Sequence, residues 1–162
     1  MPDISFDALP FDMDIAVQFK DWTEQISDIE TIVNNAVTQI LSKLENPKLG
    51  ELSIALVSDA DIQTLNRDYR NKDKPTNVLS FPDDGPAPLL GDIVLALETV
   101  KREVEEKSAP LAHHVTHLII HGFLHLQGYD HQTEKDAVEI EAREIAALAA
   151  MNIDDPYEIR DG

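Results

Sequence analysis

The chain has 162 residues, with 31 acidic and 13 basic side chains, a formal net charge of −18 at pH 7 and no cysteine. This length suits one domain with one core. The missing cysteines exclude disulfides and thiolate metal ligands, and the charge disfavours a protein that coats long duplex nucleic acid. No apolar run approaches the ~20 residues of a membrane span and the N-terminus is acidic, so we expect a cytoplasmic protein with no membrane partner.

Hydrophobic periodicity and turn residues divide the chain into strands and helices. A loose leader is predicted over residues 1–12 and a polar tail over 152–162. The predicted strands are 14–19, 51–57, 78–81 and 91–96. The predicted helices are 27–44, 59–69, 98–107, 111–127 and 133–151. We therefore expect a single compact α+β domain over residues 1–162, with a mixed sheet of about four strands packed against helices.

The segment from His121 to His131 is the most informative part of the sequence. His121 and His125 lie one helical turn apart, so a helix directs both imidazoles to the same side. Gly128 lets the chain leave the helix in a left-handed conformation, and His131 follows three residues later. Three neutral nitrogens from a helix and the turn after it predict an open site for one divalent ion. Zn²⁺ suits it best, with the fourth position left for water, although other divalent ions also accept such ligands.

The spacing H-x₃-H-x₂-G-x₂-H also matches the metal-binding part of the metzincin proteases. Gly122, however, stands where those enzymes carry the glutamate that acts as base. A zinc peptidase therefore remains one alternative, disfavoured by this glycine. A second alternative is a non-catalytic binding protein in which zinc only pins the histidine helix to its turn.

The other histidines precede the motif. His117, one turn before His121, either lines the cleft and orients a ligand or sits exposed on the helix. His113 and His114, near the start of the helix, are expected at the surface. Asp130 either caps the turn or accepts a hydrogen bond from an imidazole.

A short basic island follows the helix predicted over 59–69. It contains Arg67, Arg70, Lys72 and Lys74 against two acidic side chains, enough to hold a few phosphates. The guanidinium of Arg70 could bind phosphate oxygens through paired N–H donors, or it could offset the dipole at the C-terminus of the helix.

Three motifs now point to a known family. The run H-G-F-L-H-L-Q-G-Y-D-H from residue 121, the run L-N-R-D-Y-R-N-K-D-K-P-T-N-V-L-S-F from residue 65, and Leu-Gly-Asp-Ile from residue 90 resemble the YbeY family. The E-x-E-x-x-E-I-A-x-L segment near the C-terminus and the Asp-Pro-Tyr after it are also similar. The resemblance is close over residues 50–157 and extends to the first 50 only in layout. Asn77 departs from it, since many members have aspartate there.

The resemblance implies a compact α+β domain with a three-histidine zinc site. It also implies cleavage of single-stranded RNA, with roles in 16S rRNA 3′-end maturation and ribosome quality control. The expected partners are single-stranded rRNA and the small ribosomal subunit or its associated proteins. With these partners, the non-catalytic alternative is a ribosome- or RNA-binding factor with a structural zinc. By position, His121, His125 and His131 match the family's metal ligands, and Arg70 matches its functionally required arginine.

These residues suggest how a phosphodiester is cut. A divalent ion would lower the pKa of its water toward ~7 and so supply the attacking hydroxide. Arg70 would stabilise the charge that develops on the phosphoryl oxygens. Further substrate contacts are expected from Arg67, Lys72, Lys74 and His117.

Overall fold

The computed structural model describes residues 9–83, 85, 89–130 and 132–157. Parts of the predicted leader and tail, and His131, therefore lie outside the described residues. The strands are β1 (Met13–Val17), β2 (Glu51–Val57), β3 (Val78–Pro82) and β4 (Leu89–Ala96). The helices are α1 (Asp21–Gln25), α2 (Ile29–Ser42), α3 (Asp59–Arg70), α4 (Leu97–Lys107), α5 (Leu111–Leu126) and α6 (Glu134–Ala150). The described part has no helix with the length and apolar character needed to cross a membrane.

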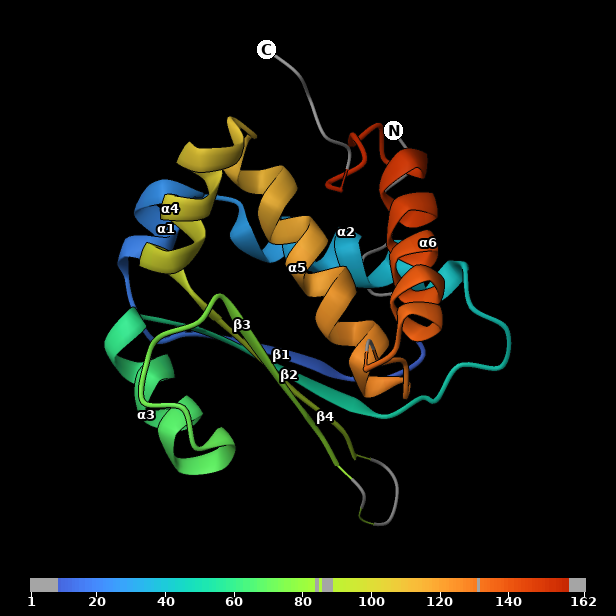
Figure 1. Ribbon diagram of the computed structural model, residues 1–162, viewed down its shortest axis with the longest axis horizontal. Coiled ribbons are helices and arrows are strands. Elements are labelled where there is room, and N and C mark those ends of the chain that lie inside the picture. The colour runs from blue at the N-terminus through green and yellow to red at the C-terminus, as the bar shows by residue number, and fades with distance from the viewer. Residues whose placement is uncertain (1–8, 84, 86–88, 131, 158–162) are drawn as a thin grey trace.

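The four strands form one mixed sheet in the order β1-β2-β4-β3. β1, β2 and β4 run parallel, and β3 pairs antiparallel with β4. Helices α2, α5 and α6 lie on one face of the sheet and α3 lies on the other (Figure 1). The predicted α+β domain with a four-stranded mixed sheet is thus confirmed.

Two clusters of buried side chains hold these layers together. The larger fills the space between the sheet and α1, α2, α5 and α6. The smaller lies under α3, where Ile62 and Leu65 meet Leu79 and Val94. Side chains of β3 alternate between the clusters: Val78 packs in the first, Leu79 and Phe81 in the second. The sheet therefore separates two packed layers, and β3 touches both.

Most predicted elements are present with ends shifted by one or two residues, but α1 is absent from the prediction. This five-residue helix is too short to show a helical period. It is anchored by Trp22, which is fully buried and donates its indole N–H to the carbonyl of Val57 at 2.9 Å. Phe11, in the predicted leader, stacks on Phe123 with ring centroids 6.4 Å apart.

β3 is an edge strand, and two of its outward backbone groups are bonded to side chains. The N–H of Ala96 donates to the Asn77 carbonyl, and the N–H of Asp83 donates to the Leu90 carbonyl. Since only every second residue of β3 bonds to β4 in an antiparallel pair, the backbone groups of Ser80 point away from β4. Arg70 donates to the Ser80 carbonyl at 2.7 Å. The N–H of Val78 bonds the Asn77 side-chain oxygen at 2.6 Å, and Pro82 has no N–H.

Candidate active site

Two imidazoles of α5 face each other on the side of the helix toward α6. The Nε2 atoms of His121 and His125 lie 2.9 Å apart, with ring centroids at 4.5 Å. Both side chains are partly exposed, on a helix that is otherwise buried over most of its length. The one-turn spacing in the sequence accounts for this pairing, since residues four apart are neighbours on a helix surface.

The end of α5 turns the chain back beside this pair. Gly128 has φ +100°, its N–H bonds the His125 carbonyl, and the N–H of Tyr129 bonds the Leu124 carbonyl, each at 3.0 Å. These two bonds form a Schellman motif, which favours glycine because of the positive φ. His131 lies outside the described residues, and among the described ones no group of three histidine or acidic side chains is placed to hold a metal ion.

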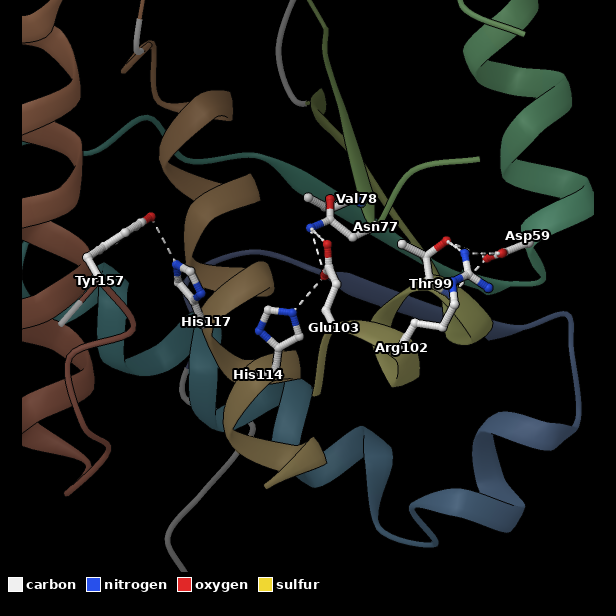
Figure 2. A network of polar contacts seen from close by, with 9 residues as sticks. All are labelled: Asp59, Asn77, Val78, Thr99, Arg102, Glu103, His114, His117 and Tyr157. Carbon is white, nitrogen blue, oxygen red and sulfur yellow. Dashed lines mark hydrogen bonds and ion pairs between the residues drawn. The ribbon is translucent and has the colours of Figure 1, made fainter. Parts of the chain in front are cut away.

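A buried carboxylate of α6 supports the pair from behind. Glu144 is fully buried, and its Oε2 accepts a hydrogen bond from Nδ1 of His121 at 2.6 Å. Its Oε1 accepts from Nε2 of His117 at 2.7 Å and from the hydroxyl of Tyr157 at 2.5 Å. Figure 2 shows Tyr157 reaching from the segment after α6 toward His117. Both histidines and the tyrosine thus converge on one acidic group.

The electrostatics of this cluster favour an ionised glutamate. Burial raises the pKa of Glu144, but the hydrogen bonds from His117 and His121 outweigh it and lower the pKa to about 2. Burial is also the main cause that lowers the pKa of His117, and burial with the bond to Glu144 raises the pKa of Tyr157. His121 therefore lies against a negative charge.

The donor set fits a divalent cation. The Nε2 atoms of His121 and His125 lie side by side, and the other ring nitrogen of His121 is held by a carboxylate. A carboxylate on the far nitrogen is the usual support of a metal-binding histidine, because it fixes the tautomer and raises the basicity of the ligating nitrogen. His121 and His125 could therefore hold such an ion.

A second polar network joins α5 to α4 and to the start of β3. His114 contacts Glu103 at 2.8 Å, and the side-chain amide of Asn77 donates to both oxygens of Glu103 at 3.0 and 3.2 Å (Figure 2). His114 is 5% exposed, so the expectation that it lies at the surface is wrong. Its carboxylate partner on α4 allows a polar ring to be buried. Asn77 donates to Glu103 here, which an aspartate could not do.

Arg70 lies at the opposite side of β3 from the sheet interior. It is the last residue of α3, its guanidinium carbon stands 5.0 Å from the centre of the Phe81 ring, and it donates to the Ser80 carbonyl. The hydroxyl of Ser80 donates to the Gly122 carbonyl at 3.3 Å, next in the chain to His121. The edge of β3 thus links the arginine to the histidine helix through one residue.

The remaining basic residues are exposed and differ in how they are held. Arg67 pairs with the adjacent Asp68 at 3.0 Å. Lys72 and Lys74 lie in the loop after α3, where the buried Asn66 accepts from the backbone N–H of Lys72 and donates to the carbonyl of Lys74. His117, also expected to contact substrate, is 6% exposed and contacts Glu144 and Tyr157.

Gly122 occupies a place where α5 approaches the sheet closely. A Cβ at this position would stand 3.0 Å from Cγ2 of Ile93 and 3.0 Å from Oγ of Ser80. A larger side chain would have to displace β3 or β4, both of which are packed. The sheet therefore fills the place where a peptidase of this ligand spacing would carry its glutamate.

The fold and the site together define an α+β domain whose sheet-packed helix carries a histidine pair backed by a buried carboxylate, an arrangement suited to metal-dependent hydrolysis. Residues 16–152 match the family described as endoribonuclease YbeY. The chain belongs to this family. It is 49% identical to endoribonuclease YbeY of Methylocella silvestris, over 90% of this chain and 85% of the relative. It is 47% identical to that of Paramagnetospirillum magneticum, over 84% and 89%.

A solved structure shares the fold. The solution structure of TM1509 from Thermotoga maritima superimposes with a TM-score of 0.54 at 19% identity, covering 94% of this chain and 98% of that protein.

Glu144 and Tyr157 are the site residues that the sequence reasoning missed. Two signals for Glu144 were present. It is the third glutamate of the E-x-E-x-x-E-I-A-x-L segment, and it stands four residues after Ile140 and four before Leu148, on the buried stripe of α6. A carboxylate at such a position requires a partner, since an isolated buried charge is costly. Tyr157 lay in a segment expected to be a polar tail, although it is the tyrosine of the Asp-Pro-Tyr that contributes to the family resemblance.

Proposed function

We propose that this protein is a metal-dependent endoribonuclease that cleaves single-stranded RNA, with a role in 16S rRNA 3′-end maturation and ribosome quality control. Its family supports the ribonuclease activity, and its relatives carry that name over most of both chains. The observation that carries the proposal is the facing pair of Nε2 atoms in His121 and His125, held on one side by Glu144.

The metal in this proposal is Zn²⁺, one per chain, held by His121, His125 and the sequence-predicted ligand His131. When bound, such an ion supplies a Lewis acid and an activated water. Imidazole ligands without thiolate or carboxylate agree with zinc and also accept neighbouring transition metals.

Arg70 is the proposed catalytic side chain. Its guanidinium sits on the Phe81 ring at the β3 edge with one N–H bound to Ser80, which leaves further donors for a phosphate. Paired N–H donors match the oxygens of a phosphoryl group whose negative charge grows during cleavage. Arg67, Lys72 and Lys74 would hold neighbouring phosphates from the same exposed surface.

The net charge of the chain indicates how RNA would be bound. With a net charge of −18, the chain offers few cations for a phosphate backbone, so free RNA should bind weakly. The small ribosomal subunit, or a protein associated with it, is proposed to present the single-stranded segment. Long duplex RNA is an unsuitable substrate because it needs an extended basic surface.

Cleavage of a labelled single-stranded RNA that carries the 16S 3′-end region tests the function. Protein depleted of metal by a chelator should be inactive, and added Zn²⁺ should restore cutting. His121→Ala should remove cleavage, whereas His113→Ala, the same change on the same helix, should leave it near the wild-type rate.

Three results would overturn the proposal. They are full activity after chelation, preferential cutting of duplex RNA, or cleavage of a denatured protein in place of RNA. The last would revive the peptidase alternative despite Gly122.

A further inference from the structure

Glu144 lies at the centre of a cluster drawn from three parts of the chain. It belongs to α6, while His117 and His121 belong to α5 and Tyr157 follows α6. The side chain is 0% exposed. An ionised carboxylate without partners would be strongly unfavourable there, and three hydrogen-bond donors make it tolerable.

The two oxygens of Glu144 divide the donors between them. Oε2 receives Nδ1 of His121, the ring that also faces His125. Oε1 receives Nε2 of His117 and the hydroxyl of Tyr157, which is itself 3.2 Å from that nitrogen. The rings of His117 and Tyr157 meet edge to face with centroids 5.4 Å apart. Oε2 therefore contacts a proposed metal ligand, and Oε1 contacts the two side chains that hold the carboxylate.

This division fixes which nitrogen of each ring carries a proton. An ionised carboxylate only accepts hydrogen bonds, so the ring nitrogen beside it must be protonated. His121 then carries its proton on Nδ1 and turns the lone pair of Nε2 toward His125. His117 carries its proton on Nε2, which agrees with the lack of a hydrogen-bond partner at its buried Nδ1 within the described residues.

We propose that Glu144 is the positioning residue of the metal site, holding His121 in the Nδ1–H tautomer with Nε2 directed at the ion, while His117 and Tyr157 hold the carboxylate in place. The inference rests on the proposed function, because it takes His121 as a ligand. It goes further in giving His117 a supporting role away from substrate and in making the segment after α6 part of the site.

Zinc affinity of the purified protein, measured by competition with a chelating dye, is the main test. Glu144→Gln keeps the size and an acceptor but removes the charge, and should weaken zinc binding by about 10- to 100-fold. Glu139→Gln makes the same change on an exposed turn of α6 and should leave the affinity within about twofold. Tyr157→Phe removes one of the donors that hold the carboxylate but keeps its charge, so it should lower the thermal midpoint and weaken zinc binding less than Glu144→Gln does.

Tautomers in the wild-type protein give a second readout that needs no variant. Long-range ¹H–¹⁵N spectra of the imidazoles, recorded without metal at alkaline pH, should show His121 protonated on Nδ1 and His117 on Nε2. These spectra keep the inference testable if Glu144→Gln fails to fold.

The outcomes separate the inference from the function. If wild type binds zinc and cuts RNA but Glu144→Gln binds zinc equally well, Glu144 is only structural and the inference is wrong while the function stands. His121 protonated on Nε2 in wild type would overturn the inference in the same way. If wild type binds no divalent metal, the proposed function fails and the inference fails with it.

Discussion

The histidine cluster (His117, His121 and His125) and the basic island (Arg67, Arg70, Lys72 and Lys74) lie on either side of the β3 edge, and they are held in opposite ways. His117, His121 and His125 project from a buried helix, and the first two are bonded to a carboxylate of another element. The basic side chains are exposed, and among the described contacts Arg70 alone of the four reaches a second element, through Ser80 and Phe81. The histidine cluster is therefore held in place by the core, whereas the basic side chains are exposed to solvent and have few contacts that hold them.

This difference teaches where substitutions should act. Changes in the histidine region should affect stability and metal binding together, since the buried side chains of His117 and Glu144 are bonded to each other and Glu144 also holds His121. Changes in the basic island should affect RNA binding and cleavage with small effects on stability, because exposed side chains contribute little to folding. Four predictions test this contrast, beginning with the largest effect.

Gly122→Glu should destabilise the fold severely. The new side chain would enter the contact between α5 and the sheet, where a Cβ alone meets Ile93 and Ser80 at 3.0 Å. Overpacking and a buried charge should together lower the free energy of unfolding by at least about 3 kcal/mol, measured by urea denaturation. Gly122→Ala, the control, should cost about 1 kcal/mol, since helix propensity offsets part of the contact. A stable Gly122→Glu protein would show that α5 and the sheet can separate.

Arg70→Glu should remove cleavage while leaving the fold largely intact. Loss of the donors to the phosphate and reversal of the charge should reduce kcat/KM by at least about 100-fold, or about 2.7 kcal/mol. The thermal midpoint should fall by no more than about 4 °C, because the contacts with Phe81 and Ser80 are exposed.

Arg70→Lys serves as its control. The charge is kept and the fork geometry is lost, so activity should fall between that of wild type and Arg70→Glu. Unfolding of Arg70→Glu, or activity that survives it, would mean that Arg70 only caps α3.

Glu103→Gln should reduce stability in a pH-dependent way. Burial raises the pKa of Glu103, but hydrogen bonds from His114 and Asn77 outweigh it, and the pKa lies below its ordinary value of 4.5. A carboxylate with a lowered folded pKa stabilises the protein above its unfolded pKa and loses that contribution as the pH falls through the folded value. The variant should therefore lose about 1 kcal/mol at pH 7 and progressively less below pH 4.5.

Urea midpoints at several pH values measure this difference. Glu105→Gln, an exposed position on the same helix, should show no such dependence on pH. A constant difference between Glu103→Gln and wild type from pH 7 to pH 3 would contradict the role of the charge.

Lys72→Ala should weaken binding of single-stranded RNA a few-fold. Each phosphate contact changes the slope of log K against log salt by about 0.7, so two to four contacts in wild type give a slope near −1.5 to −3. Removing one contact should make the slope shallower by about 0.7 with no change in the thermal midpoint. Fluorescence anisotropy over a salt series measures both. A wild-type slope steeper than about −5 would reveal a cationic surface beyond this loop.

The sequence was sufficient where structure follows from local pattern. The pattern of residues 51–57 predicted β2 with its observed bounds, and Gly128 has the expected positive φ. The pairing of His121 with His125 is likewise a property of one helix. Each of these features depends on residues at most a few positions apart.

The features that the sequence did not predict depend on contacts between distant segments. Glu144 meets His121 across 23 positions, and Tyr157 meets His117 across 40. His114 was expected at the surface because it lies near a helix start, but Glu103 on α4 gives it a buried partner. No local pattern predicted the order of the strands in the sheet either. Periodicity indicates which side of a helix is covered, not which element covers it.

The outer edge of β3 has a consequence for how the protein behaves in solution. An open edge strand invites pairing with a strand of another chain and so promotes aggregation. Arg70 occupies the outward carbonyl of Ser80, Asn77 occupies the outward N–H of Val78, and Pro82 offers no donor, so this edge is a poorer template for such pairing than a fully open strand. Variants of Arg70 would reopen one acceptor, and their monomeric fraction should be compared with that of wild type before a loss of activity is attributed to chemistry. The same arginine would then serve both the reaction and the colloidal stability of the chain.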